Sequence, residues 1–150
     1  MKKRLMPYQH WNRNELRDTL ENHVERFCVS ERFKSHWTKL IGDAFRSEHW
    51  NVLDDYNGCT MLQDHLHPDP ACFVHDFMWI TGHGGVVSDR IFYHCMISEG
   101  MPPKKAWRRW FGVRVGWYCF FMWKYLSKRD LKPITKTMAD FDKYLKNEFN

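Results

Sequence analysis

Apolar side chains recur every three or four positions in several stretches of this chain, and this spacing constrains the fold more than any other feature. The clearest stripe follows Ser30 and consists of Phe33, Trp37, Leu40, Ile41, Ala44 and Phe45. A period near 3.6 residues places such side chains on one face of an α-helix. The alternating pattern of half-buried strands has little support. The sequence therefore predicts an all-α protein.

Capping and helix-breaking residues divide the chain into further predicted helices. We expect them over residues 12–28, 70–80, 88–99, 104–126 and from 133 onward. The predicted caps or first-turn residues are Asn12 or Asn14, Ser30, Pro70, Ser88 and Pro133. The residues expected to face inward in the first and last helices are Leu16, Leu20, Val24, Phe27, Ile134, Met138, Phe141 and Leu145.

The stretch 51–70 differs in composition, because it is rich in Asp, Asn, Gly and Pro, and it is predicted to be a loop. A loop of this length inside a compact domain is usually functional. With 150 residues, no repeat and no linker, the chain is predicted to form a single domain over 1–150.

Composition points toward anionic partners. The net charge is +5 and aromatic residues make up 17% of the chain, which favours phospholipid surfaces or nucleic acid. No apolar core of a signal peptide and no run of about 18 apolar residues is present, so we expect a cytoplasmic or virion-associated protein. The five cysteines are therefore expected to be reduced by default.

His75 and Asp76 are the centre of the predicted chemistry. Adjacent residues of a helix diverge by about 100°, so the two side chains can serve different partners. A histidine in a cleft takes a proton from water near neutral pH, and an aspartate offers oxygen ligands to a hard cation. If the helix that carries Asp89 folds back antiparallel, its carboxylate accepts a hydrogen bond from the imidazole.

The surrounding residues resemble a known family. The run Asn-Gly-Cys-Thr at 57–60, the run Pro-Ala-Cys-Phe-Val-His-Asp-Phe at 70–77 and a following helix with Asp resemble the bacterial and fungal secreted phospholipases A₂. The resemblance implies that His75 activates water, that Asp89 orients His75 and that Asp76 binds calcium. It also implies that the loop supplies the remaining calcium ligands and a disulfide, through Asn57, Gly58, Cys59 and Cys72.

A second resemblance overlaps the first. The His-Asp pair, the pattern Asp-Arg-x-Phe-x-x-x-Met at 89–96 and the Trp/Arg-rich helix that follows look like a family of uncharacterised phage proteins. Together the two matches cover residues 57 to about 117 and leave 1–50 as a helical N-terminal extension. Asn57 stands where the enzymes have an acidic residue, and Trp79 stands where they have a tyrosine.

The predicted function is calcium-assisted hydrolysis of a phospholipid ester. One alternative is a phage structural or accessory protein that has an inactive phospholipase-like core and binds virion components. Another is a basic nucleic-acid-binding module. A metal phosphohydrolase of the His-Asp type would need further helical histidines. The remaining histidines match no paired zinc-ligand spacing and are expected to lie on the surface.

The segment 104–111 mixes cations with aromatic residues. Such a composition suits the headgroup layer of a membrane, and the candidate interface residues are Trp107, Arg108, Arg109 and Trp110. Two other interpretations remain open. In the first, the helix places one face in the core and keeps a solvated basic face; in the second, it binds single-stranded nucleic acid.

Overall fold

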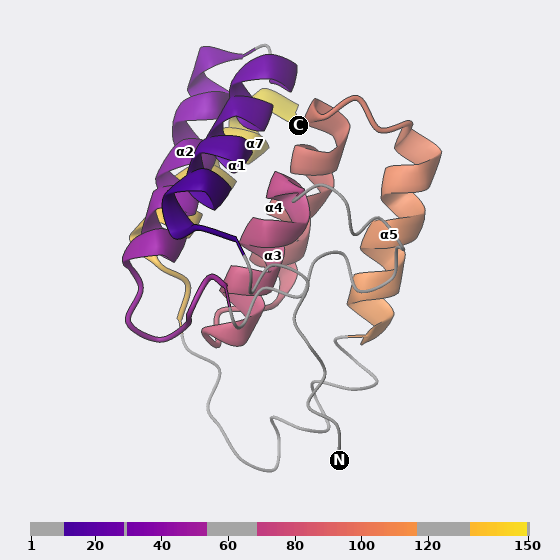
Figure 1. The fold of residues 1–150 in the computed structure, drawn as a ribbon. Coiled ribbons are helices and arrows are strands. Elements are labelled where there is room, and N and C mark those ends of the chain that lie inside the picture. Colours follow the sequence, from indigo (N-terminus) through magenta and orange to yellow (C-terminus); the bar gives the residue numbers. More distant parts are fainter. Residues whose placement is uncertain (1–10, 29, 54–68, 117–132, 150) are drawn as a thin grey trace, which may run out of the picture.

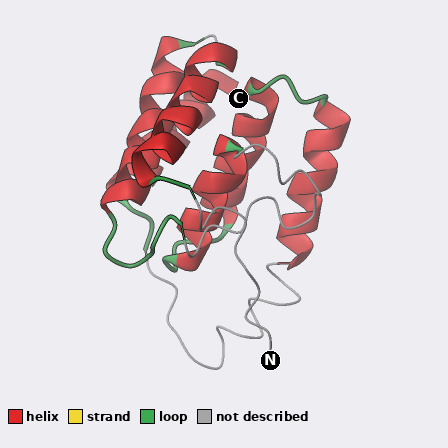
Figure 2. Cartoon of the chain, viewed as in Figure 1, coloured by secondary structure: helices red, strands yellow, loops and turns green. Residues whose placement is uncertain are grey.

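The computed structural model describes residues 11–28, 30–53, 69–116 and 133–149 (Figures 1 and 2). These residues form helices and no strands, as predicted. The helices are α1 (Arg13–Phe27), α2 (Glu31–Arg46), α3 (Pro70–Ile80), α4 (Val86–Ser98), α5 (Pro103–Gly116) and α7 (Lys136–Phe149). No helix in these ranges combines the length and hydropathy needed to cross a bilayer.

The helices α3 and α4 lie in the middle of the molecule. Helix α4 packs against α3, α5 and α7, and α2 packs against α1, α3 and α7. In Figure 1, α1, α2 and α7 therefore group on one side of the central pair, and α5 covers the opposite side. The single domain predicted from the sequence is thus organised around the pair that carries His75 and Asp89.

Aromatic rings fill the core between α2 and α3. Phe73 is fully buried, and its ring centroid lies 5.5 Å from that of Phe45 and 5.4 Å from that of Trp50. The predicted stripe of α2 is buried along its whole length. Burying each such ring contributes both apolar area and ring–ring contact.

Local capping explains where the first three helices begin. Asn12 accepts a hydrogen bond from the Asn14 amide at 2.8 Å, and Ser30 accepts one from the Phe33 amide at 3.3 Å. Asp69 caps α3, directly before Pro70. These side chains satisfy amide groups that have no partner within the helix.

The predicted start of α4 was wrong by two residues. The helix begins at Val86, and Ser88 lies in its first turn, fully buried, instead of capping it. Gly85 occupies the cap position and has no side chain to bond. The Ser88 hydroxyl accepts a hydrogen bond from the Gly85 amide at 2.9 Å, so it satisfies the cap from inside the helix.

Two residues expected to face inward are exposed. Helix α7 begins at Lys136, and the hydroxyl of Thr135, directly before it, accepts a hydrogen bond from the Met138 amide at 3.2 Å. Ile134 therefore precedes the helix, and its side chain is 41% exposed. Phe27, at the end of α1, is 45% exposed, because Cys28 takes the next inward position. Helix α5 is described to Gly116, and the rest of the predicted helix 104–126 lies outside the described residues.

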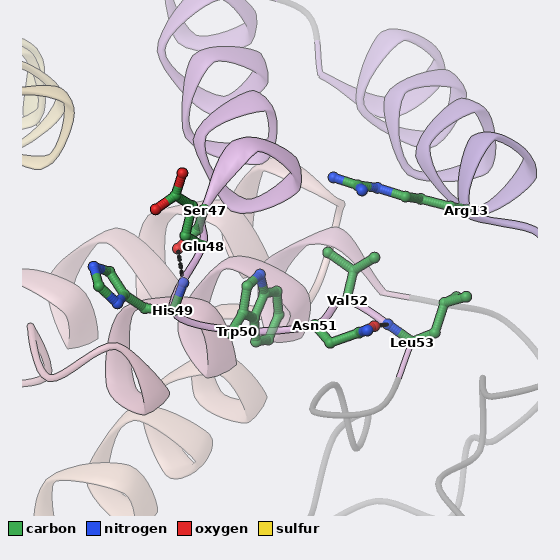
Figure 3. Close-up of a pocket in the computed structure, with 8 residues that line it drawn as sticks. All are labelled: Arg13, Ser47, Glu48, His49, Trp50, Asn51, Val52 and Leu53. Carbon is green, nitrogen blue, oxygen red and sulfur yellow. Dashed lines mark hydrogen bonds between the residues drawn. The ribbon is translucent and has the colours of Figure 1, made fainter.

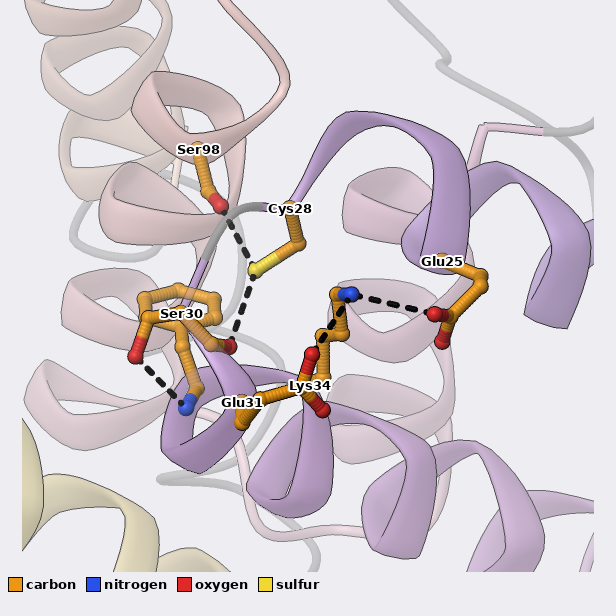
Figure 4. A network of polar contacts seen from close by, with 7 residues as sticks. Glu25, Cys28, Ser30, Glu31, Lys34 and Ser98 are labelled. Atoms are coloured by element: carbon orange, nitrogen blue, oxygen red, sulfur yellow. Dashed lines mark hydrogen bonds and ion pairs between the residues drawn. The ribbon is translucent and has the colours of Figure 1, made fainter.

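A polar network joins α1, α2 and α4 around the end of α1 (Figure 4). The Ser98 hydroxyl donates to the Cys28 sulfur at 3.1 Å. The ammonium group of Lys34 bonds Glu25 and Glu31, each at 3.1 Å. The contact with Glu25 crosses from α2 to α1 and helps to fix the turn between these two helices, whereas Glu31 belongs to α2 itself.

Two carboxyl groups meet where the start of α3 lies beside the end of α4. Asp69 and one oxygen of Glu99 both accept the Ala71 amide, at 2.8 and 3.3 Å. The imidazole of His23 lies 3.8 Å from the same Glu99 oxygen. Burial first, and then the neighbouring carboxyl of Asp69, raise the pKa of Glu99 well above its ordinary value of 4.5, against smaller opposing effects of the Ala71 amide and of Arg109.

Glu99→Gln is therefore expected to change how stability depends on pH. A folded-state pKa above the unfolded value contributes stability that is fully present below about pH 4.5 and is lost as pH rises through the raised pKa. The variant cannot ionise at this position, so it should gain stability relative to wild type at pH 8 more than at pH 5. Urea unfolding followed by tryptophan fluorescence at both pH values measures this difference.

The quantity to compare is the difference in the free energy of unfolding between Glu99→Gln and wild type at each pH. Burial lowers the pKa values of His36 and His94, which makes stability fall toward acid pH in both proteins alike. Glu48→Gln, at an exposed position, is the matched control and should follow wild type. Equal pH slopes for Glu99→Gln and Glu48→Gln would contradict the assignment.

Candidate active site

A five-residue turn from Thr81 to Gly85 reverses the chain between α3 and α4. The Gly82 amide bonds the Trp79 carbonyl at 3.1 Å, and the His83 amide bonds the Met78 carbonyl at 2.8 Å. Gly82 has a φ of 93°, which side chains disfavour, so this is a Schellman-type helix end. The turn makes the two helices antiparallel, which confirms the predicted helix pair.

A second glycine of this turn permits close packing. A Cβ atom placed on Gly84 would lie 2.5 Å from the indole of Trp79, closer than side-chain atoms approach. The glycine therefore lets the turn lie directly on the indole ring and helps to hold Trp79 over the site.

The carboxylate of Asp89 is the polar centre of this helix pair. Its side chain is fully buried, in the first turn of α4. One oxygen, Oδ1, lies 2.7 Å from Nε2 of His75 and accepts the indole N–H of Trp79 at 3.2 Å. The other oxygen, Oδ2, accepts a guanidinium N–H of Arg114 at 2.9 Å. Three donors thus satisfy a charge that would otherwise be costly to bury.

His75 is held in one orientation by this carboxylate and by two rings. Its ring centroid lies 4.5 Å from that of Phe92 and 5.7 Å from that of Trp79. The side chain is 12% exposed. A carboxylate partner places the proton on Nε2, and Nδ1 makes no hydrogen bond within the part of the chain that the structure describes. Nδ1 is therefore the nitrogen that can act as a base.

The predicted calcium ligands are only partly described. Asp76 follows His75 on α3 and is partly buried, and its carboxylate suits a hard cation. Asn57 and Gly58 lie outside the described residues, so their part in a calcium site stays a prediction. Within the described ranges, no group of three or more His, Cys, Asp or Glu side chains could hold a metal ion. The loop therefore stays the predicted source of the further oxygens of a calcium site at Asp76.

The cysteines differ in state. Cys72 is disulfide-bonded, which corrects the prediction of reduced thiols for this residue. Cys28 and Cys95 are free and buried, and burial raises the pKa of the Cys95 thiol well above its ordinary range. Pairing depends on which thiols the fold brings together, which composition cannot show. Cys59 lies outside the described residues, so its pairing with Cys72 stays a prediction.

Helix α5 exposes an apolar stripe beside its basic residues. Trp107, Phe111 and Val115 are 53%, 51% and 41% exposed, and the first two rings stack with centroids 5.4 Å apart. Of the other predicted interface residues, Arg108 is exposed, whereas Arg109 and Trp110 are partly buried. Phe111 and Val115 were not among the predicted interface residues. Their spacing of four residues from Trp107 and from each other was the signal that could have identified them.

Arg114 is the partner of Asp89 that sequence reasoning missed altogether. It stands among apolar residues, between Val113 and Val115, and its side chain is 12% exposed. A cation in such a stretch needs an anionic partner if it is buried. That requirement was the available signal, but it does not name Asp89 as the partner.

One cavity, of about 470 Å³, lies away from this site (Figure 3). It is lined by Arg13 at the start of α1 and by residues 47–53 after α2. The Trp50 indole at its wall donates to the Ala44 carbonyl at 2.8 Å and is 6% exposed. None of the predicted site residues lines this cavity.

No family model matches this chain, and no curated protein or solved structure matches it either.

Proposed function

We propose that this protein hydrolyses a phospholipid ester with the assistance of calcium, and that His75 is the general base. The observation that carries the proposal is the short contact between Nε2 of His75 and the buried carboxylate of Asp89, which leaves Nδ1 without a partner in the described part of the chain. A histidine held in this way is suited to accept a proton from an attacking water.

The residues of the chain divide the work as follows. Nδ1 of His75 takes a proton from water as the oxygen attacks the ester carbonyl, and later returns a proton to the leaving alkoxide. Asp89 retains the Nε2–H bond throughout and stabilises the imidazolium that forms. Calcium bound by Asp76, Asn57 and Gly58 would polarise the ester carbonyl and stabilise negative charge on its oxygen.

The surface of α5 supports a lipid substrate. Trp107, Phe111 and Val115 offer exposed apolar area, and Arg108 beside them is exposed and basic. Aromatic and cationic side chains together suit the boundary between headgroups and acyl chains of an anionic bilayer. Vesicle binding through this surface should weaken as salt is raised.

Asp76→Asn is expected to weaken the response to calcium. The substitution removes one negative charge from the proposed site, so about tenfold more calcium should be needed for half-maximal activity, with partial recovery at high calcium. Hydrolysis of phosphatidylglycerol vesicles over a calcium titration measures this shift. Asp140→Asn, at an exposed position on α7, is the control and should behave as wild type.

The same assay tests the proposal itself. Purified wild-type protein that hydrolyses no phospholipid at any calcium concentration would overturn the enzymatic function. A phage-like structural or accessory role would then be the better account, and binding to single-stranded DNA would instead favour the nucleic-acid-binding alternative.

A further inference from the structure

Arg114 connects α5 to the candidate active site. It lies 25 residues after Asp89 and donates to Oδ2 of that carboxylate at 2.9 Å. The side chains are 12% and 0% exposed, so the ion pair is shielded from water. Asp89, on α4, therefore receives donors from two other helices: His75 and Trp79 from α3, and Arg114 from α5.

The two oxygens of Asp89 have different partners. His75 and Trp79 share Oδ1, whereas Arg114 is the donor to Oδ2 within the described residues. A carboxylate held at one oxygen alone can turn about its last side-chain bond and exchange its oxygens. A charged donor at the second oxygen opposes this rotation, because bonds between ionised groups are the stronger and more directional ones.

We propose that Arg114 is a positioning residue, which holds the Asp89 carboxylate so that Oδ1 stays aimed at Nε2 of His75. The catalytic consequence depends on the proposed function, but the positioning itself does not. Arg114 contacts Asp89 directly, and in this proposal it acts on His75 through that carboxylate. Its place in the last part of α5 makes the geometry of His75 depend on how α5 packs against α4.

Arg114→Gln tests the proposal, with Arg90→Gln as the matched control. Arg90 also pairs with a buried aspartate, Asp142, but that pair joins α4 to α7. Both substitutions break an ion pair between an arginine and a buried aspartate. Loss of stability should therefore be similar in the two variants, whereas effects on His75 should be confined to Arg114→Gln.

Proton NMR reports on His75 without any substrate. A ring proton in a short bond to a buried carboxylate resonates far downfield and exchanges slowly with water. In Arg114→Gln the Nε2 proton should exchange about tenfold faster, the factor that corresponds to one lost hydrogen bond to a charged group. Arg90→Gln should leave its exchange unchanged. The resonance is assigned to His75 by its disappearance from the spectrum of the His75→Ala protein.

Kinetics then measures the catalytic consequence. Hydrolysis by Arg114→Gln should show kcat reduced by about 10- to 100-fold with KM little changed, since the residue orients the base and does not bind substrate. If wild type is inactive while the exchange rates still differ as expected, the proposed function fails and the positioning role stands. An unchanged exchange rate in Arg114→Gln overturns the positioning role.

A second variant covers failure to fold. Arg114→Lys keeps the positive charge and loses the forked geometry of the guanidinium. This variant should fold, and its His75 Nε2 proton should exchange at a rate between the rates of wild type and Arg114→Gln. Wild-type exchange in Arg114→Lys would show that no directed bond from Arg114 is needed, and would overturn the proposal.

Discussion

His75→Ala is expected to reduce phospholipid hydrolysis by about 10²- to 10⁴-fold, the contribution of a positioned general base. In the described part of the chain no other imidazole contacts Asp89, so no described histidine is placed to replace His75 as the base. The helical fold should remain, because the ring is replaced by a smaller side chain with good helix propensity. Initial rates on phosphatidylglycerol vesicles measure the loss, and circular dichroism checks the fold.

Two companion variants separate the chemical role from structural damage. Asp89→Asn should keep calcium binding and reduce turnover, because the imidazole loses its orienting carboxylate. His49→Ala removes an exposed imidazole that is not part of the His75–Asp89 site, so this control variant should retain wild-type rates. Wild-type hydrolysis by a folded His75→Ala would rule out His75 as the base.

Phe73→Ala is expected to destabilise the protein by about 3 to 5 kcal/mol, the range for removal of a buried phenylalanine ring. The ring is fully buried on α3 and contacts the rings of Phe45 and Trp50. Its removal leaves a cavity between α2 and α3, and rigid neighbours cannot close such a cavity completely. Urea unfolding followed by far-ultraviolet circular dichroism measures the change in unfolding free energy.

Phe149→Ala is the matched control, at the end of α7 and 55% exposed. Its cost should stay below about 1 kcal/mol, because little apolar area returns to water on unfolding. A Phe73→Ala protein as stable as Phe149→Ala would show that the ring is not packed between α2 and α3. Because α3 carries His75, activity near the unfolding midpoint should fall together with the folded fraction.

The sequence alone determined the helices and most of the residues that they bury. Leu16, Leu20 and Val24 were predicted to face inward and are buried. The predicted cap Ser30 is also observed. Periodicity and capping depend only on residues within a turn or two of each other, so they can be read from local sequence.

The errors lie where local rules compete. Ser88 has the chemistry of a cap, but Gly85 occupies the cap position before Val86, and Ser88 bonds the Gly85 amide from within the helix. Phe27 fits the apolar stripe of α1, but it sits at the helix end, where Cys28 turns inward. Ile134 fits the stripe of α7, but the helix starts after it. Helix ends depend on how the chain enters and leaves the packed layers, which a local pattern does not show.

The contacts of the candidate site were also predictable from the sequence only in part. The approach of His75 to Asp89 followed from two predicted helices joined by a short glycine-rich turn, because the two residues are only 14 positions apart in the chain. The bond from Arg114 to Asp89 and the meeting of Asp69 with Glu99 did not follow, because they depend on how α5 packs on α4 and where α4 ends beside α3. A buried charge requires a partner, but only the packing of helices decides which residue supplies it.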